Sequence, residues 1–191
     1  MLRFATILSA VLLAAASIPA SADDYSDTIK LFRGAGQSAK FFGNSYGYAV
    51  FPTIGKGGLV VGGAHGDGNV YEQGKRIGKA SMTQLSVGLQ AGGQAYSEII
   101  FFDDKAALDK FTSGNYEFGA GVSAIAITAS AGATAGTSGA GASASGSKQD
   151  ATTRGSFHDG VAVFTIAKGG LMYEASVSGQ KFSFERGGHE L

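Results

Sequence analysis

The first hydrophobic pattern is an uninterrupted apolar run at the start of the chain. Phe4–Ala16 is almost wholly apolar, follows the basic Arg3, and precedes small residues at 20–22. A positive start, a short apolar core and a small-residue cleavage site are typical of a secretory signal peptide. The alternative, a transmembrane anchor, is disfavoured because the run is shorter than the ~20 residues that span a bilayer. We therefore predict a signal peptide over residues 1–22 and a mature chain that starts near Asp23.

The next pattern has the period of an amphipathic helix. At about 100° per residue, apolar and small side chains between residues 24 and 42 fall on one broad face. The basic side chains fall within about 80° on the other face: Lys30, Arg33 and Lys40. Gly43-Asn44 suits a helix end. The sequence therefore predicts one helix over Asp24–Phe42 with an aromatic-rich face and a basic face.

Beyond Asn44 the pattern becomes that of short strands separated by turn signals. The turn signals are Gly55–Gly58, Asp67-Gly68 and Gly92-Gly93. The predicted strands are Tyr46–Phe51, Leu59–Gly63, Asn69–Glu72, Gln84–Ala91, Tyr96–Phe102, Val161–Ala167, Leu171–Ser178 and Lys181–Glu185. A short helix is predicted over Asp103–Ser113. Together these elements predict a mainly β (α+β) fold, which is a strongly twisted antiparallel sheet or a barrel-like β domain. An N-terminal amphipathic helix and one short internal helix complete it.

Residues 128–147 consist only of Gly, Ala, Ser and Thr. No side chain in this stretch is large enough to offset the entropy of ordering it, which predicts a flexible loop. The alternative is a glycine-rich hairpin that becomes ordered against a membrane or a partner.

The chain also contains an internal repeat. The segment Gly47–Leu59 reads GYAVFPTIGKGGL, and Gly160–Leu171 reads GVAVFTIAKGGL, which is one proline shorter. Such an echo predicts two equivalent strand–turn–strand units, with Lys56 and Lys168 in related positions at glycine-rich turns. The alternative is chance recurrence, because such turns have few sequence solutions.

Composition narrows the classes of function. Glycine accounts for 31 of the 191 residues, against two prolines and no tryptophan, which indicates tight turns and close strand packing. The absence of cysteine excludes disulfides and thiolate chemistry. Fifteen Lys and Arg residues balance fifteen Asp and Glu residues, so the basic excess of a nucleic-acid binder is missing. An anionic partner would have to meet a local basic patch.

Catalytic and metal-binding patterns are weak. His65, His158 and His189 lie far apart and show no metal-ligand spacing, so we expect no metal site and no cofactor. Residues 43–47 match the Gly-x-Ser-x-Gly pattern around Ser45, but a nucleophile elbow needs a strand before the serine and a helix after it. The predicted order is the reverse. A hydrolase that uses Ser45 therefore remains only a distant alternative.

The predicted N-terminal helix is suited to an anionic membrane surface. Each basic residue near such a surface contributes ~1 kcal/mol, and one inserted phenylalanine contributes ~1.5–3 kcal/mol. Lys30, Arg33 and Lys40 together with Phe32 would give a reversible peripheral contact. The alternative is that the apolar face of the helix covers the sheet, as in most soluble domains.

The motifs of the chain resemble those of the SYLF family of lipid-binding domains. The resemblance is carried by Tyr48–Pro52, by Gly57-Gly58 leading into Gly62-Gly63 and Gly66-x-Gly68, by Gly88–Gln94, and by Lys168–Leu171. It covers nearly the whole mature chain and implies one SYLF-like domain over residues 23–191. Family members bind lipid, chiefly phosphoinositides, through a basic amphipathic N-terminal segment and the adjoining domain. Some eukaryotic members also bind actin.

These observations predict a non-enzymatic protein, exported to the periplasm or secreted, that associates peripherally with membranes. The expected partner is an anionic phospholipid with a phosphoinositide-like head group, or a membrane surface, with no nucleic acid. The predicted lipid-binding residues are Lys30, Phe32, Arg33 and Lys40, followed by Lys56 and Lys168. The first alternative is a structural or interaction module of the cell envelope that holds a protein partner by its sheet edges or its glycine-rich loop.

Overall fold

The computed structural model describes residues 21–58, 61–87, 94–119, 122, 124–127, 157–168 and 177–187. Most of the predicted signal peptide, the stretch at 128–147, the Gly92-Gly93 turn and most of the predicted strand Leu171–Ser178 lie outside these residues.

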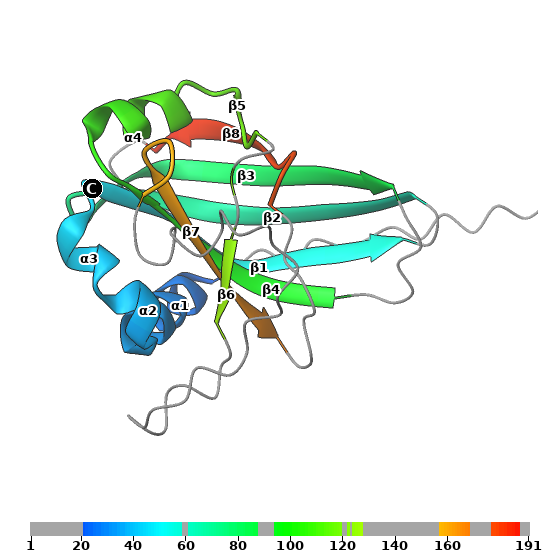
Figure 1. Ribbon diagram of the computed structural model, residues 1–191, viewed down its shortest axis with the longest axis horizontal. Coiled ribbons are helices and arrows are strands. Elements are labelled where there is room, and N and C mark those ends of the chain that lie inside the picture. Colours follow the sequence, from blue (N-terminus) through cyan, green and yellow to red (C-terminus); the bar gives the residue numbers. More distant parts are fainter. Residues whose placement is uncertain are drawn as a thin grey trace, which may run out of the picture.

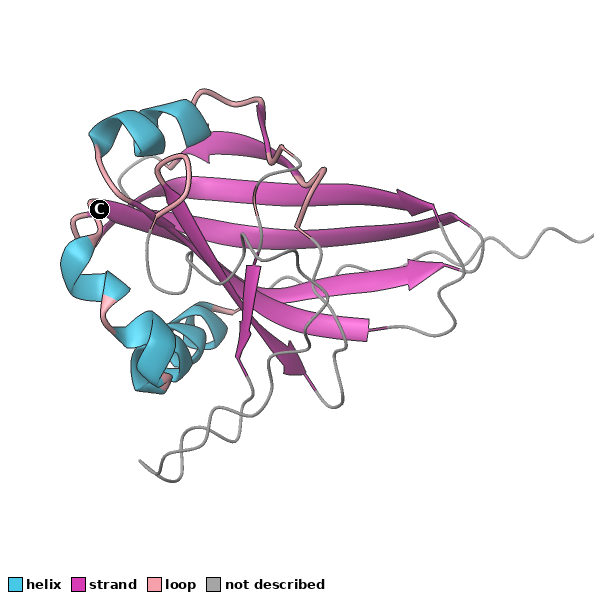
Figure 2. Ribbon diagram, viewed as in Figure 1, coloured by secondary structure: helices cyan, strands magenta, loops and turns pink. Residues whose placement is uncertain are grey.

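Within the described residues, eight strands form a strongly twisted sheet at the centre of the structure (Figure 1). Its strand order is β5-β8-β3-β2-β1-β4-β7-β6, and only β6 runs parallel to its neighbour. The seven antiparallel strands curl into a half-barrel (Figure 2), which confirms the mainly β prediction. The strands are β1 Gly47–Gly58, β2 Val61–Glu72, β3 Lys75–Val87, β4 Gln94–Phe102, β5 Tyr116–Glu117, β6 Ala124–Ile127, β7 Val161–Lys168 and β8 Lys181–Arg186.

Strands β1, β4 and β7 bury both of their faces over most of their length. The inner face of the sheet carries Phe51, Phe102 and Val163 and packs against α4 (Lys105–Phe111). The outer face carries Phe101 and Phe164 and packs against three short N-terminal helices. Strands covered on both sides need apolar residues at consecutive positions, which explains the continuous apolar runs of β1, β4 and β7. Figure 1 shows the N-terminal helices and α4 on opposite sides of the sheet.

The strands on the other side of β1 have only one buried face. In β8, Phe182 is buried, whereas Lys181 and Ser183 are exposed. In β3, Ala80 and Met82 are buried, whereas Lys79 is exposed. This alternation is the signature of a half-covered antiparallel strand. The outer face over β2, β3 and β8 is therefore mostly polar and is not capped by the helices.

The N-terminal helical region is broken rather than continuous. It comprises α1 (Ala22–Gly34), α2 (Gly36–Ala39) and α3 (Phe41–Asn44), with Ala35 in an extended conformation. The prediction of one helix over 24–42 was wrong at this point. Two nearby glycines weaken the helix by ~1 kcal/mol each, and the buried Ser38 hydroxyl donates to the carbonyl oxygen of Phe32 at 2.6 Å. The break turns Phe41 onto the sheet, where its ring stacks on Phe101 at 5.5 Å.

Two predicted glycine turns belong to strands instead. Gly55–Gly58 forms the last four residues of β1, and Asp67-Gly68 lies in the interior of β2. A Cβ atom at Gly68 would lie 2.6 Å from the ring of Phe51, so this glycine makes room for an aromatic side chain on the inner face. The tight turn between β2 and β3 lies at Gln73-Gly74, where both residues have positive φ angles of 47° and 82°. That pair of left-handed residues is typical of a two-residue hairpin turn.

The two copies of the sequence repeat become β1 and β7, which flank β4. They are not equivalent, because the pairing is displaced by one residue relative to the repeat. Phe51 packs on the inner face, whereas its counterpart Phe164 packs on the outer face. A one-residue slip reverses every side chain of a strand. By the same alternation Lys56 and Lys168, both near the start of β4, point to opposite faces.

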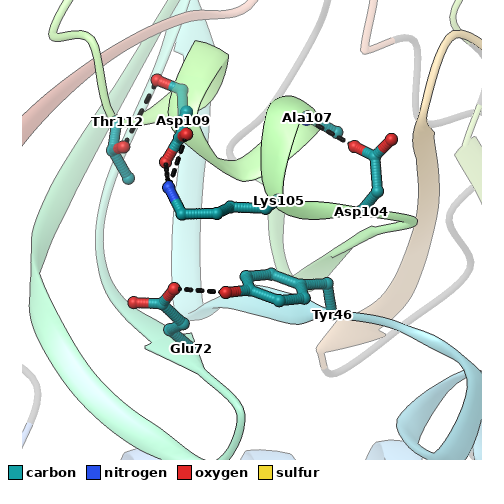
Figure 3. A network of polar contacts seen from close by, with 7 residues as sticks. All are labelled: Tyr46, Glu72, Asp104, Lys105, Ala107, Asp109 and Thr112. Carbon is teal, nitrogen blue, oxygen red and sulfur yellow. Dashed lines mark hydrogen bonds and ion pairs between the residues drawn. The ribbon is translucent and has the colours of Figure 1, made fainter.

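The internal helix α4 is held at both its ends (Figure 3). The Asp104 side chain caps its start by accepting from the backbone N–H of Ala107 at 2.8 Å. Lys105 pairs with Asp109 one turn later. Beside the helix, the Tyr46 hydroxyl donates to the Glu72 carboxylate at 2.8 Å, which ties the entry to β1 to the end of β2. The predicted helix over 103–113 is confirmed apart from its terminal residues.

Candidate functional site

Helix α1 is docked on the sheet by its apolar face. Phe32 is fully buried in the outer-face core, and Tyr25 and Ile29 pack partly buried against the same core. A capping box forms at its first turn, where the Ser21 backbone N–H donates to the Asp24 carboxylate at 2.9 Å. Ser21 belongs to the predicted signal peptide, so a mature chain that starts near Asp23 would lack this cap. Phe32, a predicted lipid-binding residue, is therefore a core residue in this structure. The exposed large apolar side chain of α1 is its neighbour Leu31, at 41%.

The predicted basic residues of the helical region are all exposed. Lys30 pairs with Asp27 at 3.0 Å, and an ion pair this exposed contributes little. The guanidinium of Arg33 lies 4.3 Å from the centre of the Phe42 ring, and the ammonium of Lys40 lies 5.7 Å from that of Phe41. These aromatic contacts orient the two cations without neutralising them.

A cleft of about 820 Å³ lies between α1 and the outer face of β2, β3 and β8. Lys30 and Arg33 line it from the helix, but Lys40, which follows the helix break, does not. The opposite wall supplies two further cations, Arg76 and Lys79, both exposed. Two carboxylates, Asp67 and Glu185, also line the cleft.

The sequence reasoning missed Arg76 and Lys79. They lie on β3 opposite Tyr71 and Asn69 of β2, and the Arg76 Nε–H donates to the Asn69 side-chain oxygen at 3.1 Å. The alternation of Lys79, Ser81 and Thr83 with buried Ala80 and Met82 signalled a strand, but we predicted a strand only from Gln84 onward. The sequence alone did not reveal how β2 and β3 pair, and without that register it could not show that these cations lie opposite the helix.

The two repeat lysines lie away from the cleft lining. The Lys168 ammonium donates to the Thr53 hydroxyl at 2.7 Å in the middle of β1. Lys56 is partly exposed on the opposite face of the sheet. The structure therefore brings Lys30 and Arg33 together in one cleft and leaves Lys40, Lys56 and Lys168 elsewhere.

A second polar cluster is buried within the inner-face core. The Gln180 amide donates to the Glu98 carboxyl at 3.0 Å and to the Tyr96 hydroxyl at 3.3 Å. Burial raises the pKa of Glu98 to about 8, so the carboxyl is mostly protonated at neutral pH. Among the described residues, the Glu98 Oε1 and the Thr165 hydroxyl across the strand pair have no hydrogen-bond partner.

Features that would support metal binding or catalysis are not assembled in the described part of the chain. No group of three or more His, Cys, Asp or Glu residues gathers there to hold a metal ion. His65 and His158 lie in the described part of the chain beside Asp67 and Asp159, and His189 lies outside it. Ser45 follows α3 and precedes β1, an order opposite to that of a nucleophile elbow.

Among the helices that the structure describes, none combines the length and the apolar character needed to cross a membrane.

Comparison with known proteins identifies the family. Residues 83–187 match the family described as Ysc84, Las17-binding protein actin regulator. Beta cell expansion factor A of Aeromonas veronii is 29% identical over 161 residues, which are 83% of this chain and 53% of that protein. The chain thus spans about half the length of this curated relative. The family match includes β4, α4, β7 and β8, whereas the N-terminal helices and the four cations of the cleft precede it. Because the match extends over more than half of the chain, the chain belongs to the Ysc84 (SYLF) family, whose domains are lipid-binding or actin-associated.

Proposed function

We propose that the protein binds anionic membrane surfaces reversibly and without enzymatic activity, through the basic side of its docked N-terminal helices. One observation carries this proposal: Arg33 and Lys40 are exposed, oriented by aromatic rings, and have no carboxylate within ion-pair distance among the described residues. Exposed, uncompensated cations beside an open cleft are attracted to a negatively charged surface.

The magnitudes fit a peripheral contact. Three cations near an anionic surface contribute about 3 kcal/mol at ~1 kcal/mol each. Lys30 contributes less than its full share because Asp27 already pairs with it. While α1 remains docked, Leu31 is the apolar side chain of α1 that is available to the lipid, since Phe32 is buried. Electrostatic attraction therefore supplies most of the binding, with a small apolar addition.

We further propose that this contact occurs in the cell envelope, on the periplasmic side or after secretion. The support is the signal-peptide pattern of residues 1–22. In such a compartment the negative charge would come from anionic phospholipid head groups.

Replacing Lys30, Arg33 and Lys40 together with alanine is expected to weaken binding to phosphatidylglycerol vesicles about 100-fold, because about 3 kcal/mol of attraction is lost. Co-sedimentation of the chain from residue 23 onward with phosphatidylglycerol and with phosphatidylcholine vesicles measures this. Lys105, Lys110 and Lys181, which do not line the cleft, form a matched control when replaced by alanine, since they remove the same charge.

The control variant is expected to bind nearly as well as the parent. Equal binding by both triple variants would move the site away from the helices, with Lys56 and Lys168 next to test. If the parent protein binds neither phosphatidylglycerol nor phosphatidylcholine vesicles, the lipid proposal fails. A protein-binding role would then be the better interpretation of the family membership.

A further inference from the structure

We propose that the cleft between α1 and strands β2, β3 and β8 is a binding site for a phosphate monoester, held from the sheet side by Arg76 and Lys79. This inference rests on the proposed function in one respect: the phosphate would normally be the head group of an anionic lipid. It goes beyond that function by assigning a shaped site and two further residues to the recognition of one chemical group.

The cleft is large enough to hold a small ligand. Its volume of about 820 Å³ lies within the ~300–1,000 Å³ range of small-molecule sites. One wall is helical and the other is a sheet, and both belong to well-packed elements. A head group entering the cleft would meet side chains from both walls at once.

The charge of the cleft matches a phosphate monoester. Four basic residues line it against two acidic ones, Asp67 and Glu185, which leaves two positive charges in excess. Phosphate monoesters carry about −1.5 to −2 at neutral pH. Among the described ion pairs, only Lys30 of the four cations takes part in one, and its partner Asp27 does not line the cleft. The other three cations are therefore available to an anionic ligand.

The hydrogen-bonding groups also suit phosphate. Asn69 holds Arg76 by its Nε–H, which leaves the terminal guanidinium nitrogens to form the paired hydrogen bonds that phosphate accepts. The Ser81 and Ser183 hydroxyls lie 2.6 Å apart between β3 and β8. One of these hydroxyls donates to the other, so the acceptor keeps its own hydrogen for a ligand.

Apolar groups complete the cleft. Tyr25 and Ile29 of α1 face it, and Tyr71 lies on the sheet side. Burial raises the pKa of Tyr25, so its phenol stays a neutral hydrogen-bond donor. Rings and an aliphatic side chain beside cations can accept the carbon frame to which a phosphate is attached. The cations of the cleft interact less strongly with a phosphodiester, because a phosphodiester carries only one negative charge.

The test compares phosphatidic acid, which carries a phosphate monoester, with phosphatidylglycerol, a diester, in vesicles matched for surface charge. The parent protein is expected to prefer phosphatidic acid. The double variant Arg76→Ala/Lys79→Ala is expected to lose that preference, about tenfold, while it still binds phosphatidylglycerol through the helices. Lys75→Ala/Lys181→Ala removes two exposed lysines outside the cleft lining and should keep the preference. Thermal unfolding confirms that the variants are folded.

Glycerol 3-phosphate, with glycerol as its blank, tests for a soluble source of the same group. Its binding by the parent but not by the double variant supports the site even if no vesicle is bound, in which case only the lipid proposal fails. Two results would overturn the site: a double variant that keeps its preference for the monoester, or a parent that has no such preference and does not bind glycerol 3-phosphate. In the second case, continued binding to phosphatidylglycerol would leave the proposed function intact.

Discussion

Phe32→Ala is expected to lower the free energy of unfolding by about 3–5 kcal/mol, as large-to-small changes at fully buried aromatic residues do. Phe32 is 0% exposed and lies in the outer-face core, the same core that holds Phe41 and Phe101. Removing its ring leaves a cavity where α1 is docked. Urea denaturation followed by circular dichroism measures the loss, and faster proteolysis near α1 would show that the helix has loosened.

The neighbouring Leu31 provides the control for this experiment. Leu31 is 41% exposed, so Leu31→Ala is expected to change the free energy of unfolding by less than about 0.5 kcal/mol. If Phe32→Ala were as stable as the parent but bound vesicles poorly, Phe32 would act in the lipid and not in the core. That result would contradict the docked arrangement of α1.

The second large effect concerns pH and Glu98. The folded protein keeps a proton on this carboxyl up to a pKa of about 8, whereas the unfolded chain releases it near 4.5. Between these values the native state binds more protons than the unfolded state, so stability falls as the pH rises. The slope is about 1.4 kcal/mol per pH unit, and the whole effect is on the order of several kcal/mol. Below pH 4.5 this contribution is fully present.

Glu98→Gln is expected to remove that slope, because an amide of nearly the same shape does not titrate. Urea midpoints measured from pH 5 to 8 for parent and variant give the difference directly. Glu117→Gln, at an exposed carboxylate, removes the same type of residue outside the core and should retain the parent slope. Parallel curves for parent and Glu98→Gln would show that Glu98 is not buried as a neutral acid.

Strands β4 and β7 could be predicted from the sequence because their apolar runs are unambiguous: Tyr96–Phe102 and Val161–Ala167 lie within them. Of β1, the predicted strand Tyr46–Phe51 covers only the first part, because β1 continues to Gly58. The glycines were misleading because a glycine serves two purposes. At Gly68 it admits the ring of Phe51 inside a strand, and at Gly74 it allows a positive φ in a turn. Local sequence does not separate these purposes, since the first depends on the neighbouring strand.

The candidate site was predictable only in part for a similar reason. The helical period placed Lys30 and Arg33 on one face of α1, but it could not show that Ser38 would satisfy the carbonyl of Phe32 and help to end the helix. Arg76 and Lys79 face α1 only after β2 and β3 pair in register and the sheet twists beside the helix. The sequence analysis did not single out Glu98, because the protonation of this carboxyl depends on its burial by distant segments.

The measurement that tests the central claim most directly is the salt dependence of vesicle binding by the parent protein. Contact between exposed cations and an anionic surface is screened by salt over a Debye length of about 10 Å at 0.1 M. Binding to phosphatidylglycerol vesicles should therefore be strong at low salt and fall steeply as salt is added, with little binding to phosphatidylcholine at any salt concentration. Equal binding to both vesicles that does not change with salt would contradict the account, because attachment would then depend on apolar insertion and not on the charges of the helical surface and its cleft.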